Sequence, residues 1–192
     1  MAVKNEKFGK SVKGKFRQAG MTLTESLLVL GIGAAVAVLA YGGYKMATGM
    51  VSASSQVRGI TQLAAGIQRV FGVAGNYADV SAANVINSRI VPSDFKVGGG
   101  VITHAWGNSV VPQPGNQVGA GTTQFRITIN GVPQNVCVDF LSGISSAATT
   151  LWAGGTTAGT HDVKDSTGTY YPARAATQCG SSATTNVILV AG

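Results

Sequence analysis

The sequence contains few of the residues from which active sites and metal centres are built. Only two of its 192 residues are histidine, two are cysteine, and 11% are charged. His104 and His161 are the only side chains whose ordinary pKa lies near neutral pH, and neither stands beside a serine or cysteine in a recognisable nucleophile motif. Cys137 and Cys179 do not form the CxxC pair of a zinc site. These absences argue against an enzyme and against a bound cofactor.

One cation site is left open near the C-terminus. His161 and Asp162, with Asp165, could bind a cation in a loop, although a solvated polar turn explains the same residues and is the expected structure. Trp106 and Trp152 fit a core or an interface better than a ligand cage. We therefore expect no metal and no ligand pocket among these residues.

Charge is scarce outside the N-terminal segment. Six of the fourteen Lys and Arg residues lie in residues 1–20, opposed only by Glu6. From Met21 onward, eight basic residues face six acidic ones. A basic flank before an apolar segment holds that end of a chain on the cytoplasmic side of a membrane. The basic character belongs to this leader, so a nucleic-acid partner is not needed to explain it.

A long apolar run follows the leader. Between Glu25 and Lys45 no residue is charged, and a helix of this length has roughly the hydrocarbon thickness of a bilayer. The run could be a secretory signal cleaved after Val38-Leu39-Ala40, or a permanent anchor that keeps the leader. A third possibility is cleavage between Gly20 and Met21, which removes the leader and retains the membrane helix.

The helical pattern continues beyond the apolar run and favours the third possibility. Apolar residues recur at helical spacing from Val57 to Ala74. A cleaved signal peptide would have no reason to be in phase with the domain that follows it. The sequence predicts one helix over residues 21–76, membrane-spanning over 21–44 and amphipathic in its second half.

The remaining residues, 77–192, predict a mixed domain of short elements. Residues 81–90 could form a short helical turn that Pro92 ends. Three segments predict strands, and the second runs into the tight-turn signal Asn130-Gly131: VITHAW (101–106), QFRITIN (124–130) and NVILVA (186–191).

Residues 136–140 fit two structures. Alternation of apolar residues favours a strand, whereas Pro133 at a first helical position and apolar residues at 136, 140 and 144 favour a short helix, which we expect.

Both cysteines lie beyond the apolar run, on the exported side if the leader stays inside. Two cysteines in an oxidising compartment predict one disulfide, Cys137–Cys179, worth roughly 4 kcal/mol in the chain-entropy model. Two unrelated buried thiols are the alternative.

The N-terminal third resembles the prepilin signature of the type IV pilin family. The resemblance consists of a basic leader ending in Gly20, a hydrophobic Met21, then Thr22-Leu23-Thr24-Glu25 and an unbroken apolar helix. The long leader, and Met where the other main class has Phe, resemble the type IVb class. A strand ending at Asn130-Gly131, the segment VPQNVCVDFL and a second Cys near the C-terminus are similar to that class too. Size and the Gly-rich C-terminal half most resemble the major pilin of thin conjugative or adhesive type IVb pili.

The resemblance implies an α+β pilin fold, with a long N-terminal helix packed on an antiparallel sheet. It implies a leader, 1–20, cut after Gly20 by prepilin peptidase, and a head, 77–192, with a disulfide-bounded region, 137–179. The implied protein is a prepilin of the inner membrane that polymerises with itself into a surface filament. The implied partners are the inner-membrane assembly platform with its ATPase, an outer-membrane secretin and a minor or tip pilin.

Glu25 acquires a partner through this resemblance. In the family, the carboxylate at the fifth mature position pairs with the N-terminal amine of a neighbouring subunit, and the matching groups here are Glu25 and the amine of Met21. Two groups that are costly to bury alone attract strongly in low dielectric, so the pair selects the axial register. The alternative is an ordinary helix-start carboxylate near the N-terminal dipole.

Small residues mark the apolar run. Gly31 with Ala35, and Gly33 with Ala37, lie one turn apart, as membrane-helix interfaces prefer, although such residues also merely tolerate lipid. Gly42-Gly43 weakens the helix by about 1 kcal/mol per residue relative to alanine. In related filaments a nearby stretch loses helicity on assembly, but this chain lacks the proline that some relatives carry there.

Three other functions share parts of this pattern. A minor pilin or a type II secretion pseudopilin would share the leader and the helix, but would cap or drive a short filament. A membrane-anchored periplasmic enzyme or binding protein would keep residues 1–20 or lose the helix entirely.

Overall fold

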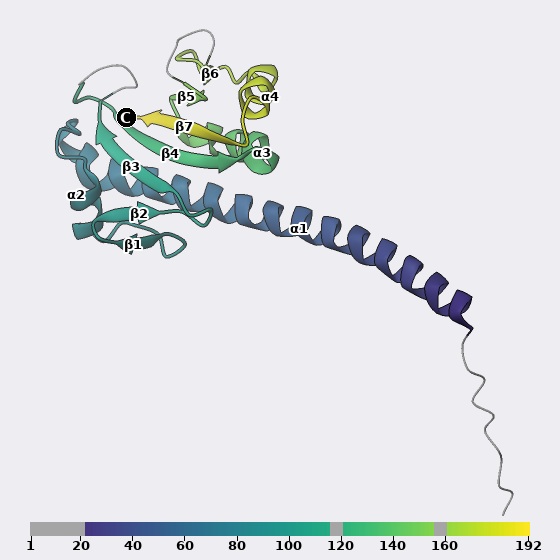
Figure 1. Cartoon of the computed structure of the whole chain (residues 1–192). Helices are drawn as coiled ribbons and strands as arrows, with labels where there is room; N and C mark the ends of the chain where they lie inside the picture. Colours follow the sequence, from purple (N-terminus) through teal and green to yellow (C-terminus); the bar gives the residue numbers. More distant parts are fainter. Residues whose placement is uncertain (1–21, 116–120, 156–160) are drawn as a thin grey trace, which may run out of the picture. The chain divides into compact units, whose positions relative to one another are not determined.

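The computed structural model describes residues 22–115, 121–155 and 161–192 (Figure 1). The chain divides into two units, residues 1–43 and residues 44–192. The expected leader, 1–20, and both residues of the expected cleavage site, Gly20 and Met21, lie outside the described residues.

The longest element is α1 (Leu23–Phe71), which occupies the described part of the first unit and enters the second. A single 3-10 turn, η1 (Gly72–Ala74), follows it, and Gly75 closes the turn with a left-handed φ of 63°. Only glycine adopts this conformation without strain, so the helical pattern that the sequence extends to residue 76 stops before Gly75. The helix is unbroken through Gly42-Gly43.

The second unit contains a seven-stranded sheet within the described residues, with strand order β1-β2-β3-β4-β7-β5-β6. Every neighbouring pair of strands is antiparallel. The C-terminal strand, β7, is an interior strand of the sheet, because it lies between β4 and β5 (Figure 1). The strands are β1 (Lys96–Gly98), β2 (Val101–Thr103), β3 (Ser109–Pro114), β4 (Phe125–Pro133), β5 (Thr150–Ala153), β6 (Asp162–Lys164) and β7 (Thr184–Ala191).

The tight turn predicted at Asn130-Gly131 is wrong. β4 continues through both residues to Pro133, and its pairing with β7 shifts between Ile129 and Val132. Gly131 supplies the positive φ, 65°, that the resulting bulge requires, and its N–H donates to Asn186 Oδ1 at 3.0 Å. Gly131 does adopt a turn-like positive φ, but because β4 continues to pair with β7 beyond it, the result is a β-bulge rather than a hairpin turn.

Three further α-helices and one more 3-10 turn accompany the sheet within the described residues, and two of the α-helices bear out expectations. α2 (Ala82–Asn87) falls within the predicted turn 81–90, and the Ser81 hydroxyl caps it by accepting from the N–H of Asn84. The ambiguous residues 136–140 lie in α3 (Gln134–Ile144), where Pro133 is the cap rather than the first helical residue. η2 (Ser145–Ala147) follows α3, and α4 (Pro172–Gly180) precedes β7.

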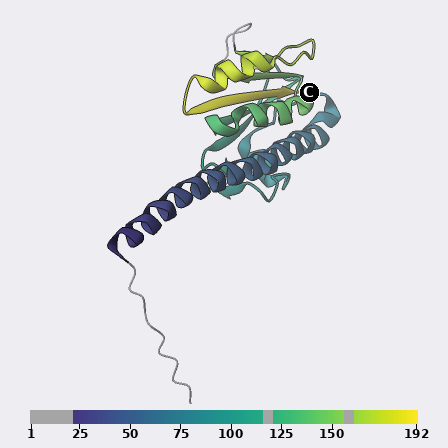
Figure 2. The ribbon, with the colours of Figure 1, turned by 90° about the vertical axis from the view of Figure 1, so that its right-hand side faces the viewer.

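The core of the second unit lies between the sheet and two helices, α1 and α3 (Figures 1 and 2). The half of α1 in this unit is amphipathic, as its spacing predicts. The core between α1, the sheet and α3 contains fully buried apolar side chains from each element. They are Ile60, Leu63 and Ile67 of α1, Phe125, Ile127 and Ile129 of β4, Phe140, Leu141 and Ile144 of α3, and Leu189 of β7. Gly143 allows α3 to approach α1 closely, because a Cβ there would lie 2.7 Å from Val57 Cγ2.

Candidate assembly interface

The first unit presents an apolar helical surface that the described chain does not cover. Leu23–Tyr44 is long and apolar enough to cross a membrane, with a mean hydropathy of 2.1 and none of it buried. Leu23 and Leu39 are 79% and 77% exposed. Moving one such side chain out of water is worth about 1.5–3 kcal/mol. This surface therefore requires lipid or further protein around it.

Thr22 sets the start of this helix. Its carbonyl accepts the N–H groups of Glu25 and Ser26, both at 3.0 Å, and its hydroxyl accepts from the Glu25 N–H at 3.4 Å. Thr22 and Glu25 stand at the two ends of the T-x-x-E spacing of a capping box. Sequence reasoning missed this role of Thr22, although the spacing before an apolar run was its signal.

Glu25 lies in the first turn of α1, where the helix dipole favours a carboxylate. Its side chain is exposed, and it forms no ion pair with any residue that the structure describes. Met21, whose amine is the expected partner, lies outside the described residues. In the single chain, Glu25 therefore has the environment of a helix-start residue, and a neighbour's amine would have to come from a second copy.

The small residues of the apolar helix make no close packing contact within the described chain. A Cβ added at Gly31, Gly33, Gly42 or Gly43 would meet nothing within 4 Å, and Ala35 is exposed. No internal contact explains glycine at these four positions. They remain available for close approach by another helix.

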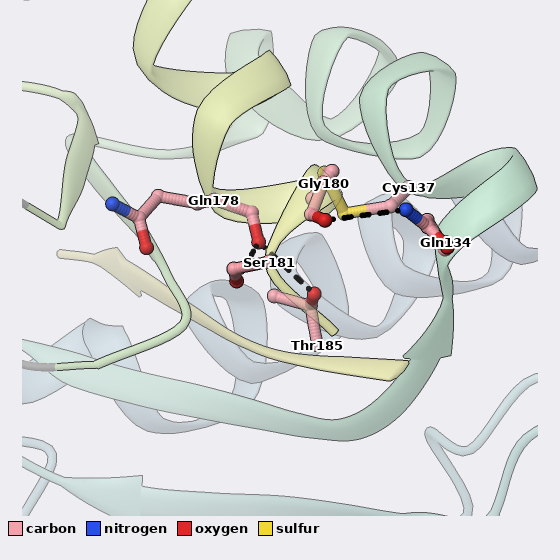
Figure 3. Close-up of a disulfide and its surroundings, with 7 residues drawn as sticks. Gln134, Cys137, Gln178, Gly180, Ser181 and Thr185 are labelled. Carbon is pink, nitrogen blue, oxygen red and sulfur yellow. Dashed lines mark hydrogen bonds between the residues drawn. A yellow bond between two sulfur atoms is a disulfide. The ribbon is translucent and has the colours of Figure 1, made fainter. Parts of the chain in front are cut away.

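Cys137 of α3 and Cys179 of α4 form a disulfide, which confirms the predicted pairing (Figure 3). Their Cα atoms are 5.7 Å apart, and both residues are buried. Hydrogen bonds tie the end of α4 beside the bridge: Gln134 Nε2 donates to the Gly180 carbonyl at 3.3 Å, and the Thr185 hydroxyl donates to the Gln178 carbonyl at 3.4 Å. The disulfide therefore fixes α4 against α3, and the Thr185 hydrogen bond holds the end of α4 beside β7.

Lys164 makes a second stabilising tertiary contact, which the sequence did not reveal. Its ammonium donates to the Ser145 carbonyl at 2.7 Å and to the Ala148 carbonyl at 2.6 Å. These carbonyls lie after α3, where helix ends favour a cation. The contact ties β6 to the end of α3, and only the folded chain brings the two segments together.

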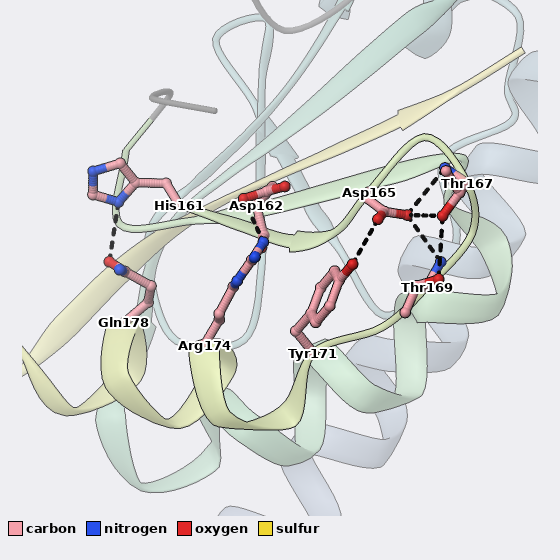
Figure 4. Close-up of polar contacts among 8 residues, drawn as sticks. All are labelled: His161, Asp162, Asp165, Thr167, Thr169, Tyr171, Arg174 and Gln178. Atoms are coloured by element: carbon pink, nitrogen blue, oxygen red, sulfur yellow. Dashed lines mark hydrogen bonds and ion pairs between the residues drawn. The ribbon is translucent and has the colours of Figure 1, made fainter. Parts of the chain in front are cut away.

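The solvated polar turn expected at His161, Asp162 and Asp165 is only partly present, because Asp162 lies in β6 and is buried, while Asp165 begins the turn that follows. The side chains of this region pair with one another (Figure 4). His161 Nδ1 lies 3.0 Å from Gln178 Oε1, and Asp162 forms an ion pair with Arg174 at 2.9 Å. Within the described ranges no cluster of three potential metal ligands occurs. The open alternative of a cation site at His161, Asp162 and Asp165 receives no support from this arrangement.

Asp165 organises the loop before α4. Its Oδ1 accepts from the Thr167 hydroxyl at 2.6 Å and from two backbone N–H groups, those of Thr167 and Thr169, at 3.0 Å. Its Oδ2 accepts from the Tyr171 hydroxyl at 2.8 Å. These hydrogen bonds, first of all the one from the Thr167 hydroxyl, lower the pKa of Asp165 to about 2.

His104 and Trp106 are structural. His104 Nε2 lies 2.7 Å from the Asn130 carbonyl, and its Nδ1 accepts from the Trp106 N–H at 3.2 Å, an arrangement that suits the neutral ring with its proton on Nε2. Burial lowers the pKa of His104 and favours the same neutral form. Trp106 packs edge-on against Phe140 with ring centroids 5.4 Å apart, and its indole donates to Ser52 of α1 at 3.2 Å. These side chains dock the β2–β3 loop on α1 and α3.

Comparison with known proteins finds a matching family and solved structures of the same fold. The family model described as PilS N terminal matches residues 50–192. The crystal structure of the type IV b pilin from Salmonella typhi is similar over 71% of this chain and 97% of that one, with 19% identity and a TM-score of 0.54. TcpA, a type IV pilin from Vibrio cholerae El Tor biotype, is similar over 73% of this chain and 99% of its own, with 14% identity and a TM-score of 0.53. A search of curated proteins found no match. At these identities the two structures establish a shared fold.

Loss of the disulfide should destabilise the second unit. Replacing both Cys137 and Cys179 by alanine is expected to lower the free energy of unfolding by about 2–5 kcal/mol, because the bridge restrains the unfolded chain. Denaturant unfolding in detergent measures the change. Reductant provides the control, since it should weaken wild-type protein to a similar extent and leave the double variant unaffected. Two free thiols found by mass spectrometry in untreated protein would contradict the prediction.

The Asp165 loop should open in acid. A carboxylate with a folded pKa of about 2 and an ordinary value of 3.8 stabilises the fold above about pH 4, and this contribution is lost as the pH falls towards 2. Asp165→Asn is therefore expected to flatten the dependence of the unfolding midpoint on pH in this window. The exposed Asp94, replaced by Asn, is the matched control and should leave the dependence in place. Equal slopes for wild type and Asp165→Asn would refute the assignment.

Proposed function

The chain belongs to the PilS N-terminal family of type IV pilins, and from this membership we propose that it is the major subunit of a type IVb pilus that serves adhesion or conjugative contact. The observation that carries the proposal is the uncovered apolar helix Leu23–Tyr44 with a single carboxylate, Glu25, in its first turn. A pilin is a structural subunit that polymerises with itself, and such a helix supplies the surface for polymerisation.

Processing precedes assembly in this proposal. Prepilin peptidase cuts after Gly20 and removes the basic leader, 1–20, on the cytoplasmic side of the inner membrane. Residues 21–44 then anchor the mature chain, with the head, 77–192, on the periplasmic side. The assembly platform with its ATPase moves the subunit into a filament that leaves through an outer-membrane secretin, with a minor or tip pilin at its end.

Cleavage also creates the partner of Glu25. The new α-amine of Met21 is a cation that exists only after processing, and in an apolar filament interior it is costly to leave unpaired. A neighbour that presents Glu25 in the correct axial register offsets this cost, whereas a neighbour out of register leaves both charges unpaired. The small residues Gly31, Gly33 and Ala35 would let the helices approach closely, and Gly42-Gly43 offers a place where α1 can yield during assembly.

Replacement of Glu25 by alanine tests the pairing. Membrane insertion should be unchanged or improved, because a charge is removed, while the yield of sheared filaments should fall by about tenfold or more because the neighbour's amine stays buried and unpaired. Thr24→Ala, in the same helical turn, is the matched control and should assemble nearly as wild type. If Glu25 served only the helix start, its loss would cost under about 1 kcal/mol and filaments would form almost normally.

N-terminal sequencing of the sheared wild-type filaments checks the processing step. The proposal requires Met21 as the first residue of their bulk component. Another first residue would refute the proposed cleavage. Presence of the chain only as a trace component would refute the role of major subunit.

A further inference from the structure

A basic groove lies where α1 meets the segment after α2. It has a volume of about 440 Å³ and is lined by Gln62, Ala65, Gly66 and Arg69 of α1 and by Arg89, Ile90 and Pro92. Arg69 and Arg89 are exposed. Neither pairs with a carboxylate of the described chain, whose single ion pair joins Arg174 to Asp162. The groove therefore offers two guanidinium groups to a partner with a carboxylate.

Arg89 stands where the fold prefers a different residue. It is the one non-glycine residue of the described chain with a positive φ, 54°, and it follows Ser88, the C-cap of α2. Glycine or asparagine usually occupies this left-handed position after a helix, because a β-carbon is disfavoured there. The backbone conformation therefore does not explain why arginine occupies this position. A role for its guanidinium group would explain it.

A complementary carboxylate lies on another flank of α1. Asp139 is exposed on α3 and lines a second groove of about 280 Å³, together with Ala53, Ser54 and Val57 of α1 and Gly143 of α3. Small and apolar residues make up most of this lining, which suits the aliphatic stem of an arginine whose head reaches the carboxylate. Asp139 forms no ion pair with a described residue either.

The other exposed carboxylates of the head are poorly placed for this contact. Asp79 lies just before α2 and Asp94 just after Pro92, in the same connection between α1 and β1 that contributes Arg89. A contact that propagates must join two different surfaces of the subunit. Of the three exposed aspartates in the described head, Asp79 and Asp94 lie on the same connection as Arg89. Asp139 lies elsewhere, on α3, and is therefore the candidate partner.

We propose that the groove of Arg69 and Arg89 on one copy binds Asp139 on α3 of a second copy. The contact rests on the proposed filament, because it joins heads that the helices already hold side by side. The α1 residues that line the two grooves are about 16 Å apart along the helix, at 1.5 Å per residue, so the contact displaces one copy along the axis of the next. A contact between different surfaces with such a displacement continues as an open helix rather than closing a ring.

Charge reversal in the full-length chain tests the contact. Arg89→Asp and Asp139→Arg should each lower the filament yield by about tenfold, because each places like charges together, while the double variant R89D/D139R should recover a substantial part of it, less than all because Arg69 still faces the introduced arginine. Lys96→Asp, on the exposed edge strand β1, is the control and should assemble as wild type. Arg89→Asn keeps a residue suited to the left-handed backbone, so its head should be at least as stable as wild type while filament yield still falls.

A cross-link supplies a readout that does not depend on yield. In R89K filaments, a zero-length carbodiimide should join the introduced amine to Asp139 of a neighbouring chain, and mass spectrometry of the cross-linked dimer should identify the two peptides. Intermolecular linkage of this amine to another carboxylate, or no linked dimer, would overturn the proposal. So would single reversals that assemble normally or a double variant without recovery. If wild-type protein formed no filament, the proposed function would fail first, and the two failures are thus distinguishable.

Discussion

The proposed assembly depends on one surface that a single chain does not bury. Leu23–Tyr44 exposes leucine, isoleucine and valine on all sides, and each of them gains about 1.5–3 kcal/mol on leaving water. In the proposed assembly, lipid meets this requirement before polymerisation and other copies of the helix meet it afterwards. A carboxylate at the start of such a surface is costly in both environments, so in this proposal its pairing with a neighbour's amine decides how subunits align.

The second unit is built to hold a helix whose other half must stay uncovered. Its part of α1 buries one face against the sheet and α3, with Leu63 and Ile67 fully enclosed. The strands are short, and the C-terminal third is fastened by separate devices: the Cys137–Cys179 bridge, the Lys164 ammonium on carbonyls after α3, and the hydrogen bonds to Asp165. Arg89, after α2, and Asp139, on α3, remain exposed on the surface of the head.

The sequence reveals the elements whose signals are local or periodic. The long helix, the strands at 124–130 and 186–191 and the helix around Cys137 follow from spacing and capping. Asn130-Gly131 misled because β7, far along the chain, pairs with β4 beyond the apparent turn and converts it into a bulge. Lys164 and the Arg69–Arg89 groove could not be found for the same reason, since their partners or neighbours are distant in sequence. Thr22 was within reach, because a T-x-x-E spacing marks a helix start.

The pairing of Glu25 can be seen in a helical reconstruction of sheared wild-type filaments at a resolution that shows side chains. We expect residues 23–44 to form the filament interior and the Glu25 carboxylate to lie about 2.7–2.9 Å from the Met21 amine of a neighbouring subunit, as charge-assisted hydrogen bonds require. A Glu25 that faces solvent, or one separated from every neighbouring amine by more than about 6 Å, would contradict it.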